Sequence, residues 1–298
     1  MKKIARLAMA IMFIISFGLS PQMSYAALWE EPKVSTEDES IKVTVDETGL
    51  TKGPVTVTID SSTYKNGTNV SYSWDLEKQI TGSTARFAIT KNGEYQFAVS
   101  DITSDYDYTG DTLWAEKWCT VVITNIDNEK PTVKLGGTFM DQYGYRYIRY
   151  DTDDDKGIRR IKHPDGEYSD YTDYSADPGI GAAGNYQIIK NGKYTFVAED
   201  YAGNKTTRTV IISDYKVVPL KVYKVTGKTK YVTGKTLPKA KVSADNTRIV
   251  LGTAKADSKG NFKMKLKSAQ KTGSVFYVSS LDVNKKSVTN TVKVKVVK

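Results

Sequence analysis

Apolar and polar residues alternate with a period of two over much of the chain after residue 40. The alternation is clear at 42–45 and 55–59, and again at 262–267 and 292–296 near the C-terminus. Successive side chains of a strand point to opposite faces of a sheet, so this period predicts strands with one buried and one solvated face. No window shows the apolar stripe of an amphipathic helix. The expected fold class is therefore all-β.

One phrase occurs twice. Ile-Thr-Lys-Asn-Gly-Glu-Tyr-Gln-Phe at 89–97 returns as Ile-Lys-Asn-Gly-Lys-Tyr-Thr-Phe at 189–196, with the two Asn-Gly pairs 99 residues apart. Asn-Gly is a strong turn signal because both residues tolerate positive φ, and Tyr-x-Phe alternates as a strand does. We therefore expect a hairpin at each Asn-Gly, inside two copies of a small β domain.

The repeat and the turn signals divide the chain into domains. Strands at this spacing without intervening helices predict two-sheet sandwiches. The closing strands at 120–123 and 209–212 are only 89 residues apart, so the first copy carries about ten extra residues, within 101–117. The expected parts are a signal peptide (1–26), a linker (27–39), an acidic first domain (40–127), an acidic second domain (128–214) and a strongly basic third domain (215–298).

The first 26 residues have the pattern of an export signal. A basic start precedes a short apolar run at 7–19, and small residues stand at Ser24 and Ala26 before the expected cut. No cysteine stands directly after the run, as a lipoprotein anchor would need, and the sequence has no Leu-Pro-x-Thr-Gly motif. We expect an extracellular, secreted protein that is associated with the cell wall without a covalent anchor and has no membrane span after processing. The lone Cys119 excludes an intramolecular disulfide and is expected to be buried.

Charge is distributed unevenly along the chain. Residues 215–298 hold 20 Lys and Arg against 3 Asp and Glu, a net charge of +17, whereas residues 27–214 have a net charge of −11. Solubility needs a net charge of only about 2–8, so this excess predicts an anionic partner, such as a wall or matrix polymer. The basic domain could also dock on the acidic domains of its own chain. The candidate polyanion ligands are Lys263, Lys265, Lys267, Lys293 and Lys295.

Lysine offers point charges without fixed geometry, so we expect poorly selective binding. Specific nucleic-acid binding is not expected, because the basic residues are not visibly interleaved with exposed aromatic residues.

The insertion at 101–117 is a second candidate site. Tyr106, Tyr108 and Trp114 could anchor a ligand on a host or neighbouring cell surface, since loops at sandwich ends often carry recognition. The loop could equally fold back over an exposed sheet edge.

A weak calcium candidate lies in the second domain. Asp151, Asp153 and Asp155 have the one-three-five spacing of a calcium loop, but Lys156 stands where the sharp-turn Gly belongs. A solvated acidic loop is the other interpretation.

Enzymatic patterns are lacking in the sequence. It has no Gly-x-Ser-x-Gly, His-Glu-x-x-His, phosphate loop or zinc spacing, and His163 is its only histidine. We expect no catalytic residue and no cofactor.

The first two copies resemble the immunoglobulin-like repeats of surface and secreted proteins of Gram-positive bacteria. The resemblance rests on the repeated phrase, on Glu-Asp-Tyr-Ala-Gly-Asn at 199–204 and on Pro131 at the changeover. The third segment resembles a bacterial Ig domain of modular adhesins, through Val-Thr-Gly-Lys-Thr at 232–236 and Asp-Ser-Lys-Gly-Asn-Phe at 257–262.

The resemblances imply tandem Ig-like β-sandwiches with a role in adhesion, spacing or wall association, and no catalytic residues. The expected function is an exported, non-catalytic Ig-like protein for cell-surface or matrix association. The alternative is a carbohydrate-binding or accessory module of an extracellular system, acting through surfaces rich in Tyr and Trp.

Overall fold

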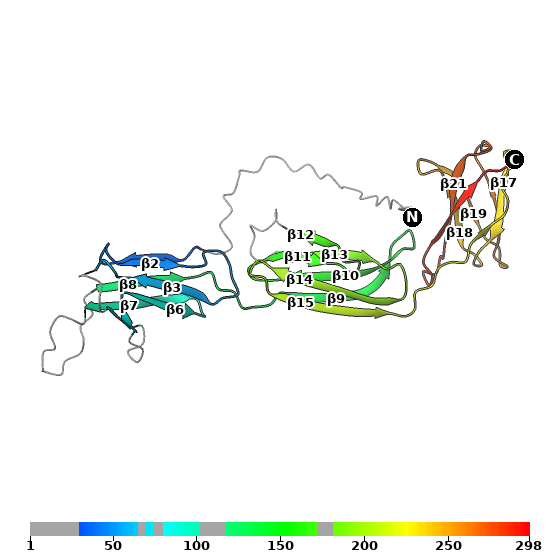
Figure 1. The fold of residues 1–298 in the computed structure, drawn as a ribbon. Coiled ribbons are helices and arrows are strands. Elements are labelled where there is room, and N and C mark those ends of the chain that lie inside the picture. Colours follow the sequence, from blue (N-terminus) through cyan, green and yellow to red (C-terminus); the bar gives the residue numbers. More distant parts are fainter. Residues whose placement is uncertain (1–29, 65–69, 74–79, 102–116, 172–180) are drawn as a thin grey trace, which may run out of the picture.

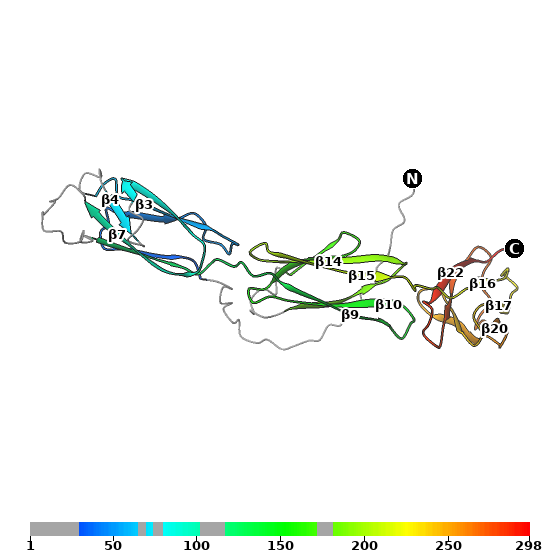
Figure 2. The same ribbon diagram turned by 90° about the horizontal axis from the view of Figure 1, so that it is seen from below.

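The computed structural model describes residues 30–64, 70–73, 80–101, 117–171 and 181–298. In these ranges the chain forms 22 strands and no helix, so the all-β prediction is confirmed. Six antiparallel sheets are grouped into three units that lie in a row along the chain (Figure 1 and Figure 2). Within the same ranges there is no helix of the length and hydropathy needed to cross a membrane.

The first unit is a sandwich of a five-stranded sheet, ordered β1-β8-β7-β4-β5, and a three-stranded sheet, ordered β2-β3-β6. Its core lies between the sheets, where Val55, Val57 and Ile59 of β3 are fully buried together with Val121 and Ile123 of β8. The strands are β1 (Lys33–Thr36), β2 (Lys42–Val45), β3 (Val55–Asp60), β4 (Val70–Ser73), β5 (Ile80–Gly82), β6 (Thr84–Ile89), β7 (Gly93–Asp101) and β8 (Lys117–Ile123).

Part of the predicted linker 27–39 is a strand. β1 pairs antiparallel with β8, from Lys33 opposite Val122 to Thr36 opposite Cys119. The linker prediction relied on the polar and acidic composition of the segment. Such residues are compatible with an edge strand, because one side of it faces solvent. The first domain therefore begins before residue 40.

The second unit repeats the two-sheet plan with different strand numbers. Its sheets are ordered β13-β10-β9 and β12-β11-β14-β15. Ile148, Ile161 and Phe196 are fully buried between them. The strands are β9 (Thr132–Met140), β10 (Arg146–Asp153), β11 (Ile158–Lys162), β12 (Tyr168–Asp170), β13 (Ala182–Gln187), β14 (Gly192–Asp200) and β15 (Lys205–Ile212).

The third unit is a sandwich of sheets β16-β17-β20 and β19-β18-β21-β22. The apolar members of its alternating strands, including Met264, Phe276 and Val278, are fully buried. The strands are β16 (Lys221–Val222), β17 (Tyr231–Lys235), β18 (Lys241–Asp245), β19 (Val250–Lys255), β20 (Asn261–Lys265), β21 (Val275–Leu281) and β22 (Asn290–Lys295).

The hairpin prediction at the repeated Asn-Gly phrase is wrong. In the first unit the flanking strands β6 and β7 belong to different sheets, and the same holds for β13 and β14 in the second. Each phrase is therefore a crossover between sheets. The tyrosine fixes it: Tyr95 Oη donates to the Lys91 carbonyl and Tyr194 Oη to the Lys190 carbonyl, both at 2.7 Å. This contact is a tyrosine corner of the kind found in Ig-like sandwiches.

The asparagine of the phrase holds the chain where it leaves each unit. Asn92 Nδ2 donates to the Ile126 carbonyl at 2.8 Å, and the Ile126 amide donates back to Asn92 Oδ1 at 2.9 Å. In the second unit the Tyr215 amide donates to Asn191 Oδ1 at 2.7 Å. The side-chain amide thus replaces the turn that Asn-Gly predicts and fixes the exit segment instead.

Candidate functional site

The five candidate lysines of the third unit occupy the solvated positions of alternating segments. Lys263, Lys265 and Lys267 are exposed, whereas Phe262, Met264 and Leu266 between them are buried. On β22, Lys293 and Lys295 are exposed beside buried Val294 and Val296. The apolar neighbours fix the strands in the core, and the backbone then directs each ammonium group outward.

The two lysine rows lie on different sheets. β20 belongs to the three-stranded sheet of the unit and β22 to the four-stranded sheet. Because the sheets pack their apolar faces together, their outer faces point away from one another. The candidate residues therefore divide between two faces of the sandwich, which meet at the edge where Lys221, Lys293 and Lys295 line one groove.

The outer face of β16-β17-β20 carries the denser row, which we call the lysine face and define by Lys221, Lys235, Lys263 and Lys265. Lys221 lies opposite Lys235 across β16 and β17. On β17 and β20, Thr233 lies opposite Lys263 and Tyr231 opposite Lys265. All four lysines are exposed.

Two exposed tyrosines stand within the lysine face. Lys263 Nζ lies 4.6 Å from the ring centroid of Tyr231, and Lys221 Nζ lies 5.8 Å from that of Tyr223. Both distances are within the range of cation–π attraction. The expectation that basic residues lack exposed aromatic neighbours is therefore wrong on this face. Alternation alone did not show which strands pair, and the pairing creates these contacts.

The positive charge of the third unit has little local compensation. Its three carboxylates accept backbone amides in turns: Asp245 from Thr247, Asp257 from Lys259 and Asp282 from Asn284. Between described residues, no ion pair within 4.0 Å joins a lysine or arginine of 215–298 to any carboxylate. Among those residues, the basic unit meets the second unit through hydrogen bonds rather than ion pairs: the Thr289 amide donates to the Gly144 carbonyl at 2.9 Å, and Thr289 Oγ1 donates to the Tyr143 carbonyl at 2.6 Å.

The insertion candidates Tyr106, Tyr108 and Trp114 lie outside the described residues. The ligand site proposed for them stays a prediction, as does the alternative that the loop covers a sheet edge. β7 ends at Asp101 and β8 begins at Lys117, so the described strands on either side agree with the position of the insertion.

The Cys119 thiol and the His163 imidazole lie in different units. Cys119 is fully buried in β8, and burial, followed by the nearby Glu37 charge, raises its pKa to about 11. His163 follows β11, with Nε2 2.8 Å from Ser169 Oγ, and burial lowers its pKa. The structure therefore does not bring the two together as a nucleophile and base.

The weak calcium candidates Asp151, Asp153 and Asp155 all have exposed side chains. They occupy the outward positions of β10 and of the loop after it, where the burial pattern alternates. Asp154 lies between these outward positions, and its side chain is buried, with 7% exposed. Calcium binding by the three exposed aspartates stays a prediction. The buried aspartate of this acidic run, Asp154, has different neighbours.

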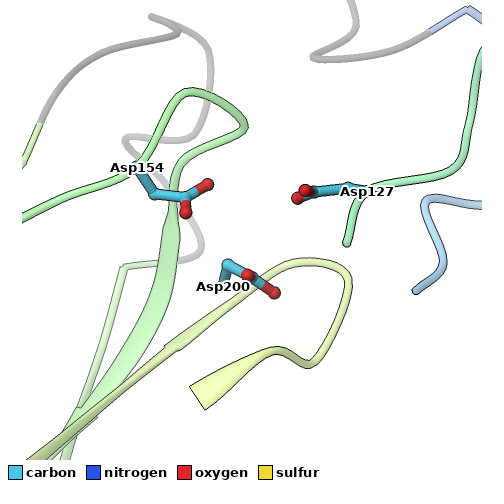
Figure 3. Close-up of side chains that lie close together, drawn as sticks. All are labelled: Asp127, Asp154 and Asp200. Atoms are coloured by element: carbon cyan, nitrogen blue, oxygen red, sulfur yellow. The ribbon is translucent and has the colours of Figure 1, made fainter. Parts of the chain in front are cut away.

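Asp154 belongs to a cluster of three buried aspartates, which we call the junction triad: Asp127, Asp154 and Asp200. One carboxylate oxygen from each lies within 4.8 Å of the others. Figure 3 shows the Asp127 and Asp154 carboxylates pointing toward one another with Asp200 close by. Asp127 follows β8 at the exit of the first unit, Asp154 follows β10, and Asp200 ends β14.

Each triad member uses one oxygen to hold a turn. Asp127 Oδ1 accepts the Glu129 amide at 2.9 Å, Asp154 Oδ1 the Lys156 amide at 2.9 Å and Asp200 Oδ1 the Asn204 amide at 2.8 Å. The second oxygens of Asp127 and Asp200 are buried and have no hydrogen-bond partner.

Burial dominates the electrostatics of the triad. It raises the pKa of Asp154 to about 7, and it raises the pKa of Asp127 and of Asp200. The backbone amides oppose these increases, while repulsion from the other carboxylates adds to those of Asp127 and Asp154.

Sequence reasoning missed the triad. Its members are 27 and 46 residues apart, so no local spacing relates them. One signal was available: the alternation of β10, extended by one residue, places Asp154 on the same side as buried Tyr150 and Thr152.

Comparison with known proteins gives the family of the third unit. Residues 218–297 match the family model of the bacterial Ig domain. The cell wall-associated protease of Bacillus subtilis (strain 168) is 38% identical over 117 residues, which cover 36% of this chain and 13% of that protein. The chain therefore spans only a small part of the length of this relative.

Solved structures are also similar, at low scores. The biofilm-associated protein BSP domain has a TM-score of 0.24 and 9% identity, covering 93% of this chain and 68% of the other. The chicken CNTN1 FN1-FN3 domains have a TM-score of 0.23 and 12% identity, covering 86% and 98%. The family assignment therefore rests on the matched residues alone: the C-terminal unit of this chain is a bacterial Ig domain.

Proposed function

We propose that this chain is an exported, non-catalytic surface module whose C-terminal Ig domain binds an anionic wall or matrix polymer. The observation that carries the proposal is the uncompensated charge of that domain, a net of +17 in which the three carboxylates serve turns. The bacterial Ig match and the cell wall-associated relative support a location at the cell surface.

The strand register supports binding rather than solubility as the reason for the charge. Lys221 lies opposite Lys235, and Lys241 lies opposite Lys255. Like charges directly opposite one another destabilise a sheet. A negatively charged polymer would relieve this repulsion. The positive field of the domain would also speed the encounter between the polymer and the domain.

The lysine face supports a flat, charge-driven contact. Its strands are held by a packed core, so the ammonium groups are presented on a rigid surface, while each lysine stem remains adaptable. Such a surface suits a repeating, flexible polyanion without strict sequence, because lysine does not impose a bidentate geometry.

Binding of the chain from residue 27 onward to isolated Gram-positive cell walls tests the proposal. We expect retention on intact walls, loss after the anionic polymers are extracted, and release as salt approaches about 1 M, where the Debye length is about 3 Å. Retention that is independent of salt and of the polymers would contradict the proposal.

Paired variants identify the binding face. We expect Lys263→Gln with Lys265→Gln to lower the salt concentration needed for release more than Lys293→Gln with Lys295→Gln, because β20 lies in the denser lysine face. The matched control is Lys134→Gln with Lys193→Gln, which removes two exposed lysines from the second unit. An equal effect of the control would show that only net charge matters.

The alternative is a carbohydrate-binding or accessory module. The exposed rings of Tyr223 and Tyr231, 45% and 43% accessible, favour it, since rings on a sheet face can stack on sugars. Glycan binding that is insensitive to salt and lost in Tyr231→Ala would support this function over the charge-driven one. Loss in Trp114→Ala would instead identify the inserted loop as the binding site.

A further inference from the structure

We propose that the junction triad is a calcium site that fixes the first Ig-like unit to the second. Asp127 belongs to the exit segment of the first unit, whereas Asp154 follows β10 and Asp200 ends β14 in the second. This inference concerns the junction of the first two units and not the lysine face of the third, and it goes beyond the proposed function.

The triad has no ion-pair partner among the described residues. Asp127, Asp154 and Asp200 are 5%, 7% and 0% exposed. Between described residues, no Lys or Arg nitrogen lies within 4.0 Å of these carboxylates, and Lys156 instead pairs with Asp155 at 3.9 Å. Buried charges in proteins are normally paired or bound to a metal, because removing them from water is costly.

Two oxygens of the triad are available to bind a cation. Oδ2 of Asp127 and Oδ2 of Asp200 are buried without a hydrogen-bond partner, whereas the Oδ1 atoms are used by backbone amides. Buried polar atoms are rarely left unsatisfied, and an ion is one of the groups that completes them. The turns thus orient one oxygen of each carboxylate and leave the other available.

The ligand type and the irregular setting suit calcium. Two oxygens bound at about 2.4 Å to one calcium ion lie at most about 4.8 Å apart, whereas magnesium demands a near-ideal octahedron and keeps several of its waters. The triad oxygens lie within 4.8 Å of one another. Calcium takes six to eight oxygen ligands and accepts irregular geometry, so water and carbonyl oxygens would complete the site.

The surroundings hold the triad in place across the junction. Asp127 is held by its amide, which donates to the Thr51 carbonyl at 2.7 Å, and by the Asn92 contacts to Ile126. Its carbonyl accepts Asn204 Nδ2 of the second unit at 2.9 Å. Asp127 is also the triad member that lines a groove of about 340 Å³, together with Asn92 and Lys156.

Calorimetric titration of the chelator-treated chain from residue 27 onward with calcium chloride tests the proposal. We expect one ion per chain and, in each of Asp127→Asn, Asp154→Asn and Asp200→Asn, binding that is weaker by about tenfold or more. Asparagine keeps the Oδ1 acceptor of each turn, so the three variants should fold. The matched control is Asp153→Asn, which removes an exposed carboxylate next to the triad and should leave the affinity unchanged.

Proteolysis provides a second readout. Glu129 is exposed between the units, and calcium should slow cleavage after it by a glutamyl endopeptidase, with no such protection in Asp154→Asn. No binding of calcium at millimolar concentration, equal binding of magnesium, or a loss in Asp153→Asn as large as in Asp154→Asn would overturn the proposal. None of these measurements involves an anionic polymer, so they are independent of the proposed function.

Discussion

At the residue scale, the repeated phrase shows that residues can make contacts other than the turn that their local conformational preference predicts. Asn-Gly predicts a hairpin because both residues tolerate positive φ. Here the asparagine side chains bind the exit segments and the tyrosines bind the carbonyls four residues upstream. Repetition predicted two copies of one domain, but it could not reveal that these residues join two sheets.

Removal of the Tyr194 hydroxyl should show how much the tyrosine corner contributes to stability. Tyr194 Oη also accepts the Ile189 and Lys190 amides, both at 3.2 Å, so Tyr194→Phe leaves backbone groups without a partner. We expect a loss of about 1–3 kcal/mol in the free energy of unfolding, measured with urea. Tyr168→Phe, which changes an exposed tyrosine, should stay within about 0.5 kcal/mol. Equal effects of the two variants would contradict a structural role for the corner.

At the element scale, alternation predicted strands well and their pairing poorly. The alternation at 42–45 matches β2 to the residue and that at 55–59 matches β3 to within one residue, whereas the alternation at 262–267 extends past the end of β20 at Lys265. Pairing depends on which sheet each strand joins, a long-range choice that period two does not encode. For the same reason the lysine rows were predicted but their division between two faces was not, and β1 was taken for a linker.

The edge strand β1 should protect the thiol of Cys119. Thr36 lies opposite Cys119 in the β1–β8 pair, and burial raises the thiol pKa to about 11, so very little thiolate exists at pH 8. We expect the intact chain to react with a thiol reagent at pH 8 only after denaturation. A chain that begins at residue 38 should react faster under native conditions. Immediate reaction of the intact chain would contradict the protected position.

At the scale of the whole molecule, the three units divide the chain by charge. The two acidic units come first, and the basic bacterial Ig domain comes last. The sequence predicted this division and the sandwich class, because the net charge and the alternation of each segment can be obtained without knowing how the segments pack. The junction triad was not predicted, because it combines residues from two units that only the fold brings together.

The central claim is that the C-terminal domain holds the protein to an anionic polymer. Its most direct test compares the chain from residue 27 onward with the same chain lacking 215–298, by the fraction retained on isolated Gram-positive cell walls as salt is raised. We predict that the longer chain is retained at low salt and released by about 1 M salt, and that the truncated chain is not retained at any salt concentration. Equal retention of both chains would contradict the claim.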